Sequence, residues 1–194
     1  MSRHRRCGGC GWSAAAAARA FALLVARARR SGYSGSVSKQ PVVIYSDGAC
    51  LGNPGPGGYG TVLLAGKHRK ELSAGYRHTT NNRMELLGAI VGLEALKRPC
   101  RVTLWSDSQY LIHALSKGWL AGWQRKGWRT ADKKAVKNQD LWQRLLRAIG
   151  EHEIDWQWVR GHSGNVENER CDRLAMAAAT GGNLLEDEGF AGDD

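Results

Sequence analysis

Two short apolar runs in this chain each lead to an aspartate. Residues 42–45 precede Ser46-Asp47 and a glycine-rich stretch, and residues 102–105 precede Ser106-Asp107. Runs of this length, rich in β-branched and aromatic residues, predict buried strands. A carboxylate at the end of a buried strand is costly unless another group neutralises it. The two runs therefore predict one sheet with an acidic site at its strand ends.

Two further acidic residues interrupt the apolar faces of predicted helices. Glu85 lies within residues 81–96, and Asp172 lies within residues 167–179, where apolar positions recur with the helical period. Carboxylates brought together repel one another unless a hard divalent cation lies among them. The alternative, a set of unrelated solvated or salt-bridged acids, fits a single such residue better than a set of four. The four residues predict a Mg²⁺ site, with Mn²⁺ as an alternative ion, suited to phosphoryl chemistry: Asp47, Glu85, Asp107 and Asp172.

The charge distribution separates a leader from the rest of the chain. The first 40 residues contain seven Arg, one Lys and no acid, whereas all 18 acidic residues lie at or after Asp47. We expect residues 1–40 to be a disordered or lone-helical leader and residues 41–180 to form the folded domain. Residues 181–194 are acidic and glycine-rich, which predicts a frayed tail.

The leader leaves two interpretations of the cellular compartment open. Its Arg-rich, acid-free composition is typical of an organelle transit peptide, and an inert extension is the alternative. Arg19 interrupts its apolar stretch, so no membrane span is expected. Five scattered cysteines indicate a reducing compartment. We therefore expect a cytoplasmic monomer, or a protein of an organelle matrix if the leader directs import.

Hydrophobic periodicity predicts an α/β protein. The expected strands span residues 42–46, 58–65, 70–76, 101–105 and 154–159. The expected helices span residues 81–96, 109–115, 119–126, 138–149 and 167–179. This order indicates a mixed sheet with helices on its faces.

Five segments of the chain carry a resemblance to a known family. They are DGACLGNPGPGG (47–58), TTNNRMEL (79–86), SDSQY (106–110), GHSG (161–164) and NERCD (168–172). Together they resemble bacterial-type ribonuclease H, type 1, from about residue 41 to residue 180. The resemblance implies a ribonuclease H-like fold, a five-stranded mixed sheet with helices on both faces. It also implies an endoribonuclease that hydrolyses the RNA strand of RNA–DNA hybrids and leaves 5′-phosphate and 3′-hydroxyl ends.

The resemblance also implies roles for the acidic residues and for one histidine. Asp47 would be shared by two Mg²⁺ ions, Glu85 and Asp107 would complete one side, and Asp172 would hold the ion on the nucleophile side. His162 lies between glycines, where a histidine near a metal-bound water can relay protons or help the product leave. A surface histidine without a role is the alternative.

Substrate recognition is predicted to use short polar side chains and a basic projection. Amides at loops and helix starts suit minor-groove edges and 2′-OH groups, and Thr80 and Arg83, at the start of the first long helix, suit a DNA phosphate. Helix capping is the alternative for Thr80 and Asn81. Residues 117–134 interleave three Trp with six Lys or Arg, which resembles the basic handle of the family. The predicted contacts are Asn53, Thr80, Asn81, Asn82, Arg83, Gln109, Trp119, Lys126, Lys133 and Lys134.

Two other functions stay open at this point. A different nuclease on the same fold would also cluster acids on such a sheet, and a non-catalytic protein could bind hybrids without cutting them. The second would be expected to lack at least one carboxylate, and none is missing. Four other tryptophans are interpreted as core or near-core residues: Trp105, Trp142, Trp156 and Trp158.

Overall fold

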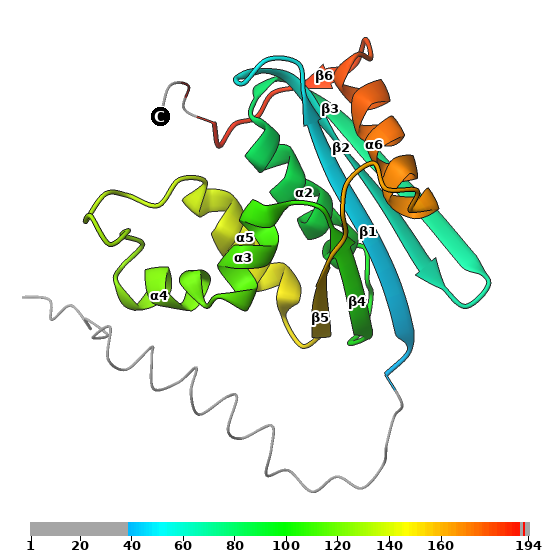
Figure 1. The fold of residues 1–194 in the computed structure, drawn as a ribbon, viewed down its shortest axis with the longest axis horizontal. Coiled ribbons are helices and arrows are strands. Elements are labelled where there is room, and N and C mark those ends of the chain that lie inside the picture. Colours follow the sequence, from blue (N-terminus) through cyan, green and yellow to red (C-terminus); the bar gives the residue numbers. More distant parts are fainter. Residues whose placement is uncertain (1–38, 191, 193–194) are drawn as a thin grey trace, which may run out of the picture. The chain divides into compact units, whose positions relative to one another are not determined.

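The described residues form a mixed sheet of six strands in the order β5-β4-β1-β2-β3-β6 (Figure 1). The computed structural model describes residues 39–190 and residue 192, so the expectations for the leader up to residue 38 lie outside it. Neighbouring strands are antiparallel from β1 to β3 and parallel elsewhere. The strands are β1 (Pro41–Cys50), β2 (Gly55–Ala65), β3 (His68–Thr79), β4 (Arg101–Ser106), β5 (Glu153–Trp158) and β6 (Leu184–Leu185).

Helices cover both faces of this sheet. A helix that packs on β1 and β2, α2, lies on one face, and α6 lies on the other, because β2 presents Thr61 to α2 and Gly60 to α6 (Figure 1). None of the helices within residues 39–190 is long and apolar enough to cross a membrane. The helices are α2 (Asn81–Glu94), α3 (Gln109–Ser116), α4 (Trp119–Arg125), α5 (Gln139–Ile149) and α6 (Val166–Ala179). The predicted α/β class and mixed sheet are confirmed, with one strand more than the five expected.

The main core fills the space between the sheet and the layer formed by α2 and α5. Ile44 of β1 and Leu104 of β4 are fully buried against apolar residues of α2 such as Ile90. On α5, Trp142 is fully buried as well, and its indole N–H donates a hydrogen bond to the hydroxyl of Tyr110 at 3.0 Å. The partnered N–H removes the cost of burying a polar group. The core therefore fixes the sheet relative to α2 and α5.

Close backbone approach fixes α6 on the opposite face. A Cβ atom added at Gly60 would lie 2.1 Å from the carbonyl oxygen of Cys171, and one added at Gly58 would lie 2.7 Å from the carbonyl oxygen of Ala175. Real side chains do not fit at such distances, so glycine is required on β2 where α6 crosses it.

The C-terminal segment differs from the frayed tail that the sequence predicts. Leu184 and Leu185 form β6 and pair with Gly75 and Tyr76 of β3. The side chain of Leu184 fills the space beside Gly75, where an added Cβ would lie 2.7 Å from Leu184 Cδ2. The acidic residues that follow find basic partners on the body of the domain. The expected frayed tail is therefore wrong for residues 184–190, because apolar burial and ion pairing hold them.

Gly60→Ala should destabilise the protein, whereas Gly122→Ala should not. The added Cβ at Gly60 meets the α6 backbone, and overpacking of this kind costs about 1–3 kcal/mol. Gly122 lies inside α4 with no atom within 4 Å of an added Cβ, so alanine there should stabilise the helix by up to about 1 kcal/mol. Urea denaturation of both variants measures the difference. Equal free energies of unfolding would show that α6 does not rest on β2 as described.

Candidate active site

Asp47 and Asp107 start from neighbouring positions on adjacent strands. The parallel register of β1 and β4 pairs Ser46 with Ser106, and each aspartate is the next residue along the chain. Because adjacent strands lie about 4.8 Å apart, the two carboxylates leave the sheet side by side. β1 continues to Cys50, whereas β4 ends at Ser106. Two separate strand-aspartate motifs thus supply a single site.

Two glycines allow α2 and α6 to bring their carboxylates to Asp47. A Cβ atom added at Gly48 would lie 2.3 Å from the backbone nitrogen of Glu85, so the first turns of α2 rest directly on β1. On β2, Gly60 pairs with Asp47 and touches the carbonyl of the residue that precedes Asp172. The structure therefore places Glu85, Asp107 and Asp172 within electrostatic range of Asp47.

Burial and mutual repulsion control the charge of Asp47. Its exposed fraction is 7%. Burial raises the pKa of Asp47 to about 8, and the negative charges of Asp107, Asp172 and Glu85 add to the rise. The N–H of Gly48 donates a hydrogen bond to Asp47 Oδ1 at 2.7 Å, and this hydrogen bond opposes the rise in the pKa of Asp47. Asp47 is therefore the carboxylate that gains most from a neighbouring positive charge.

Glu85 is held by hydrogen bonds while its charge is also disfavoured. Burial raises the pKa of Glu85 to about 7, with a smaller rise from the charge of Asp107. The Ser108 hydroxyl donates to Glu85 Oε2, and the Asn81 amide donates to Oε1 at 2.8 Å. Both hydrogen bonds oppose the rise in pKa. They also orient the carboxylate, because each oxygen has its own donor.

The chemistry of these donors fits a hard divalent cation. Oxygen ligands from carboxylates are those that Mg²⁺ and Mn²⁺ prefer, and a cation would relieve the repulsion that raises the pKa of Asp47. Asn168 lies one turn before Asp172 on α6, and its buried Oδ1 atom has no hydrogen-bond partner within the described part of the chain. Over residues 39–190 and 192, however, no three His, Cys, Asp or Glu side chains are already gathered as a metal-holding group. The fit of this site to a divalent cation therefore rests on its oxygen ligands and on the repulsion between their charges.

The loop that carries His162 contacts Asp107. A Cβ atom added at Gly161 would lie 2.6 Å from Asp107 Oδ2, so the loop backbone packs against the carboxylate. His162 itself is exposed and has a φ of 51°, in the left-handed region that disfavours non-glycine residues. Backbone strain of this kind is frequent at functional sites. The structure thus places the predicted histidine beside the acidic cluster.

Trp158 corrects one interpretation of the sequence. The sequence predicts a core or near-core position for it, but it is 47% exposed, and its indole N–H donates to the main-chain carbonyl of Asp107 at 3.1 Å. It lies at the end of an edge strand, β5, where no further strand covers it. Sequence reasoning also did not assign a role to Ser108, although a serine before a predicted helix is a common N-cap signal. Its hydroxyl accepts from Leu111 N at 3.1 Å.

Two of the predicted amides, Asn53 and Asn82, line a cavity at the start of α2. Asn53 Oδ1 accepts from the backbone N–H of Asn81 at 3.2 Å, which ties the glycine-rich loop to the start of α2. Thr80 occupies the N-cap position of α2, yet its side chain makes no capping hydrogen bond. Its hydroxyl is therefore not committed to capping. The cavity has a volume of about 200 Å³ and is lined by Asn53, Pro54, Thr80, Asn82, Lys137, Asn138 and Phe190.

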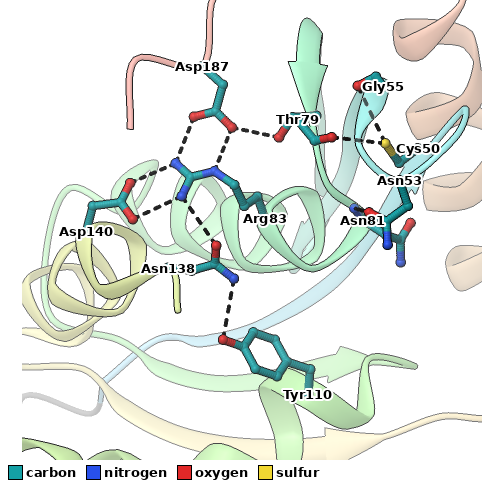
Figure 2. Close-up of polar contacts among 10 residues, drawn as sticks. All are labelled: Cys50, Asn53, Gly55, Thr79, Asn81, Arg83, Tyr110, Asn138, Asp140 and Asp187. Carbon is teal, nitrogen blue, oxygen red and sulfur yellow. Dashed lines mark hydrogen bonds and ion pairs between the residues drawn. The ribbon is translucent and has the colours of Figure 1, made fainter. Parts of the chain in front are cut away.

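Arg83 does not reach the surface, contrary to its expected contact with a DNA phosphate. Its exposed fraction is 2%, and its guanidinium donates hydrogen bonds to Asp187, Asp140 and Asn138 (Figure 2). Burial would lower the pKa of Arg83, but the hydrogen bonds to both aspartates raise it overall. The prediction of a direct phosphate contact is therefore wrong, because the acidic partners occupy the donors of this side chain.

The basic segment 117–134 presents one tryptophan to solvent. Trp119 is 41% exposed, and Lys117 Nζ lies 5.6 Å from the centre of its ring. Trp123 packs between Trp119 and the core residue Trp142, with ring centres 6.4 and 5.5 Å apart. The remaining predicted contact residues of this surface are exposed: Gln109, Lys126, Lys133 and Lys134.

Asp47→Asn should stabilise the metal-free protein above about pH 4. The folded pKa of about 8 exceeds the ordinary value of 3.8. The folded state therefore keeps a proton that the unfolded state has lost, and the free energy of unfolding falls as the pH rises between these values. Asparagine removes this penalty, so the variant should exceed wild type by on the order of 1–3 kcal/mol at pH 8 and by nothing near pH 4.

Urea denaturation in EDTA at both pH values measures this difference. Asp132→Asn, a change of the same kind at an exposed residue, is the matched control. If the free energies of unfolding of Asp47→Asn and wild type differ by the same amount at both pH values, the raised pKa of Asp47 is contradicted.

Comparisons with known proteins agree with this arrangement. The family model described as RNase H matches residues 39–180. Ribonuclease H of Idiomarina loihiensis is 56% identical over 156 residues, which is 80% of this chain and 99% of that protein.

Two solved structures extend the comparison. LC9-RNase H1, described as a type 1 RNase H with the type 2 active-site motif, is 30% identical with a TM-score of 0.68, over 80% of this chain and 81% of that one. LC11-RNase H1, solved with an RNA/DNA hybrid, shares the fold at 23% identity and a TM-score of 0.55, over 71% of this chain and 96% of that one. From the match to residues 39–180 and the identity over almost the full length of a curated relative, it follows that the chain belongs to the ribonuclease H family of enzymes.

Proposed function

We propose that this chain hydrolyses the RNA strand of RNA–DNA hybrids with the help of two Mg²⁺ ions. The observation that carries the proposal is that carboxylates from α2, the end of β4 and α6 lie close enough to the buried Asp47 of β1 for their charges to raise its pKa. Membership of the ribonuclease H family supports the reaction. So does the likeness of the fold to LC11-RNase H1, which was solved with an RNA/DNA hybrid.

The acidic residues divide into three roles toward the metal ions. Enzymes of this family depend on divalent metal ions in general. In the proposal Asp47 is shared between two ions, Glu85 and Asp107 complete one side, and Asp172 completes the other. When bound, two such ions supply an activated water and neutralise the charge on the leaving 3′-oxygen. Mn²⁺ is the alternative ion, because it takes the same oxygen ligands.

The other residues of the site bind substrate and move protons. Asn53 and Asn82 line the cavity at the start of α2, and Asn81 lies between Asn53 and Glu85, so these amides suit minor-groove edges and 2′-OH groups. Thr80, with its uncommitted hydroxyl, suits a phosphate of the DNA strand.

Contacts farther from the carboxylates complete the proposed interface. Gln109 lies at the start of α3, and the exposed ring of Trp119 supplies a stacking surface among the cations Lys126, Lys133 and Lys134. Cleavage inside a bound strand leaves 5′-phosphate and 3′-hydroxyl ends, because the 3′-oxygen is the leaving group.

The proposed location is the cytoplasm, where the enzyme acts as a monomer. Three cysteines of the described domain, Cys50, Cys100 and Cys171, are free thiols, which suits a reducing compartment. The relative reported above is bacterial. An organelle matrix is the alternative if the Arg-rich leader directs import.

The full chain should cut the RNA strand of an RNA–DNA hybrid only when Mg²⁺ is present. Asp107→Asn should reduce kcat by at least about a thousandfold, because the loss of a metal ligand removes stabilisation of the transition state. End-labelled duplexes resolved on a denaturing gel, with Mg²⁺ or EDTA, measure the cleavage. The substrates are the hybrid, duplex RNA, duplex DNA and single-stranded RNA.

Each other outcome points to a different function. Binding of the hybrid without cleavage would leave a non-catalytic hybrid-binding protein, and cleavage of duplex DNA would indicate another nuclease of this fold. A readout independent of activity is the thermal midpoint, which Mg²⁺ should raise in wild type more than in Asp107→Asn.

His162→Ala should slow the reaction without abolishing it. A histidine that assists proton transfer from an exposed loop contributes about 10- to 100-fold to kcat, less than a metal ligand. The KM for the hybrid should stay within about twofold, because the residue is not among the proposed substrate contacts. Steady-state kinetics on a short hybrid measure both constants, with His68→Ala, an exposed histidine on β3, as the control. An unchanged kcat would remove His162 from the proposed mechanism.

A further inference from the structure

A single buried guanidinium joins three segments that surround the substrate cavity. Arg83, on α2, donates to Asp140 on α5 through both terminal nitrogens, at 3.0 and 2.7 Å. It donates to Asp187 of the C-terminal segment through Nε at 2.7 Å and Nη2 at 2.8 Å (Figure 2). It also donates to the side chain of Asn138, before α5, at 3.4 Å. Asp140 and Asp187 lie 57 and 104 residues from Arg83 in sequence, so this contact sets the relative positions of the three segments.

Asp187 accepts hydrogen bonds from Thr79 and Arg83, which lie on opposite sides of Thr80 in sequence. Its Oδ2 atom accepts both from Arg83 and from the hydroxyl of Thr79, the latter at 2.6 Å. Thr79 is fully buried at the end of β3. The connection between β3 and α2, which contains Thr80, is therefore anchored from both ends to one carboxylate.

The rest of the C-terminal segment lies directly on this ion pair. A Cβ atom added at Gly189 would lie 2.1 Å from Asp140 Oδ2 and 2.7 Å from Arg83 Nη2. The ring of Phe190 stands 5.9 Å from the guanidinium carbon of Arg83 and 5.3 Å from the ring of His78. The backbone of the segment thus closes over the guanidinium and leaves it no path to solvent on that side.

Three of the residues that line the cavity, Thr80, Asn138 and Phe190, are held by this network. Thr80 is bracketed by Thr79 and Arg83, and the Asn138 side chain lies between Arg83 and the hydroxyl of Tyr110. Phe190 supplies a third wall by its contact with Arg83. Asn138 has a φ of 57° and makes no capping hydrogen bond to α5 with its side chain. Its amide is committed to the network instead, which fixes the face that it turns to the cavity.

Asp187 is the partner on which the network depends most. Its side chain is 9% exposed, whereas that of Asp140 is 42% exposed and partly satisfied by water. A buried guanidinium needs a desolvated counter-charge, and removing one partner leaves an uncompensated buried charge. The loss of Asp187 would therefore free Arg83 and Thr79 to move together with the cavity walls.

We propose that Asp187 is a positioning residue for nucleic-acid binding. Through Arg83 and Thr79 it holds the walls of the cavity that receives the sugar–phosphate backbone of the hybrid. The C-terminal segment is then part of the substrate-binding apparatus, although Asp187 itself does not touch substrate. The inference rests on the proposed function, because that function assigns the cavity to the hybrid.

Electrostatics alone predicts the opposite effect for a change at this position. Nucleic-acid binding is governed by phosphate charge, so removing an acidic side chain near the interface should tighten it. Asp187→Asn removes one negative charge but also disrupts the network. Weaker binding by this variant would therefore indicate lost positioning rather than lost charge.

The test compares Asp187→Asn, Thr79→Val and Glu186→Gln in the full chain. Thr79→Val keeps the shape of the side chain and removes only its hydrogen bond to Asp187. Glu186→Gln is the matched control, because Glu186 is exposed and pairs with Arg77 at the surface. Steady-state kinetics give KM and kcat, fluorescence anisotropy of a labelled hybrid in EDTA gives Kd, and thermal unfolding shows whether each variant is folded at the assay temperature.

Asp187→Asn should raise KM and Kd by about tenfold and Thr79→Val by about threefold, with kcat within about twofold of wild type. Glu186→Gln should leave both constants unchanged or slightly lower. Unchanged KM and Kd in the folded variants, with only a lower thermal midpoint, would reduce Asp187 to a structural brace and overturn the proposal. Should Asp187→Asn fail to fold, Thr79→Val decides the question by the same criteria. Wild type that binds but does not cut the hybrid would refute the proposed function while Kd still tests this inference.

Discussion

The site depends on the close contact of two helix backbones with the strands around Asp47. Gly48 and Gly60 lack side chains where α2 and α6 cross, so both helices reach the sheet at van der Waals distance. This contact buries a carboxylate that water would otherwise solvate, and it brings three more within range of its charge. A larger residue at either glycine would separate the elements that supply the acids. The geometry of the site therefore depends on Gly48 and Gly60 as much as on the acidic residues.

Two clusters of charge in this domain follow opposite physical rules. Around Asp47 like charges gather, and the pKa of Asp47 rises because burial and these negative charges both disfavour its ionised form. Around Arg83 one positive charge meets two negative ones, and each donor of the guanidinium has an acceptor. The carboxylates of the first cluster repel one another unless a cation binds among them, whereas the charges of the second cluster already balance. On α2, Glu85 therefore belongs to the acidic cluster around Asp47, whereas Arg83, two residues earlier, belongs to the ion-pair network.

The acidic site was readable from sequence because each carboxylate lies in a local context that plain structure does not explain. The strand-aspartate motifs at Asp47 and Asp107 predict one sheet edge, and the structure adds the register that sets them side by side. Arg83 was misread because its main partner, Asp187, lies 104 residues away in a segment whose composition predicts disorder. Trp158 was misread because an edge strand and a central strand share the same alternating pattern. Local sequence patterns thus pointed to the acidic residues, whereas the burial of Arg83 depends on a partner that is distant in sequence.

The chain order of these contacts bears on how the enzyme matures during synthesis. Asp47 emerges early from the ribosome, but its neighbours on β4 and α6 follow at positions 107 and 172, and Asp187 comes near the C-terminal end. A nascent chain that has not yet released its last segment lacks both the fourth carboxylate and the partner of Arg83. The acidic cluster and the Arg83 ion pair are therefore completed late in synthesis, because each needs a residue that follows its first member by more than 100 positions.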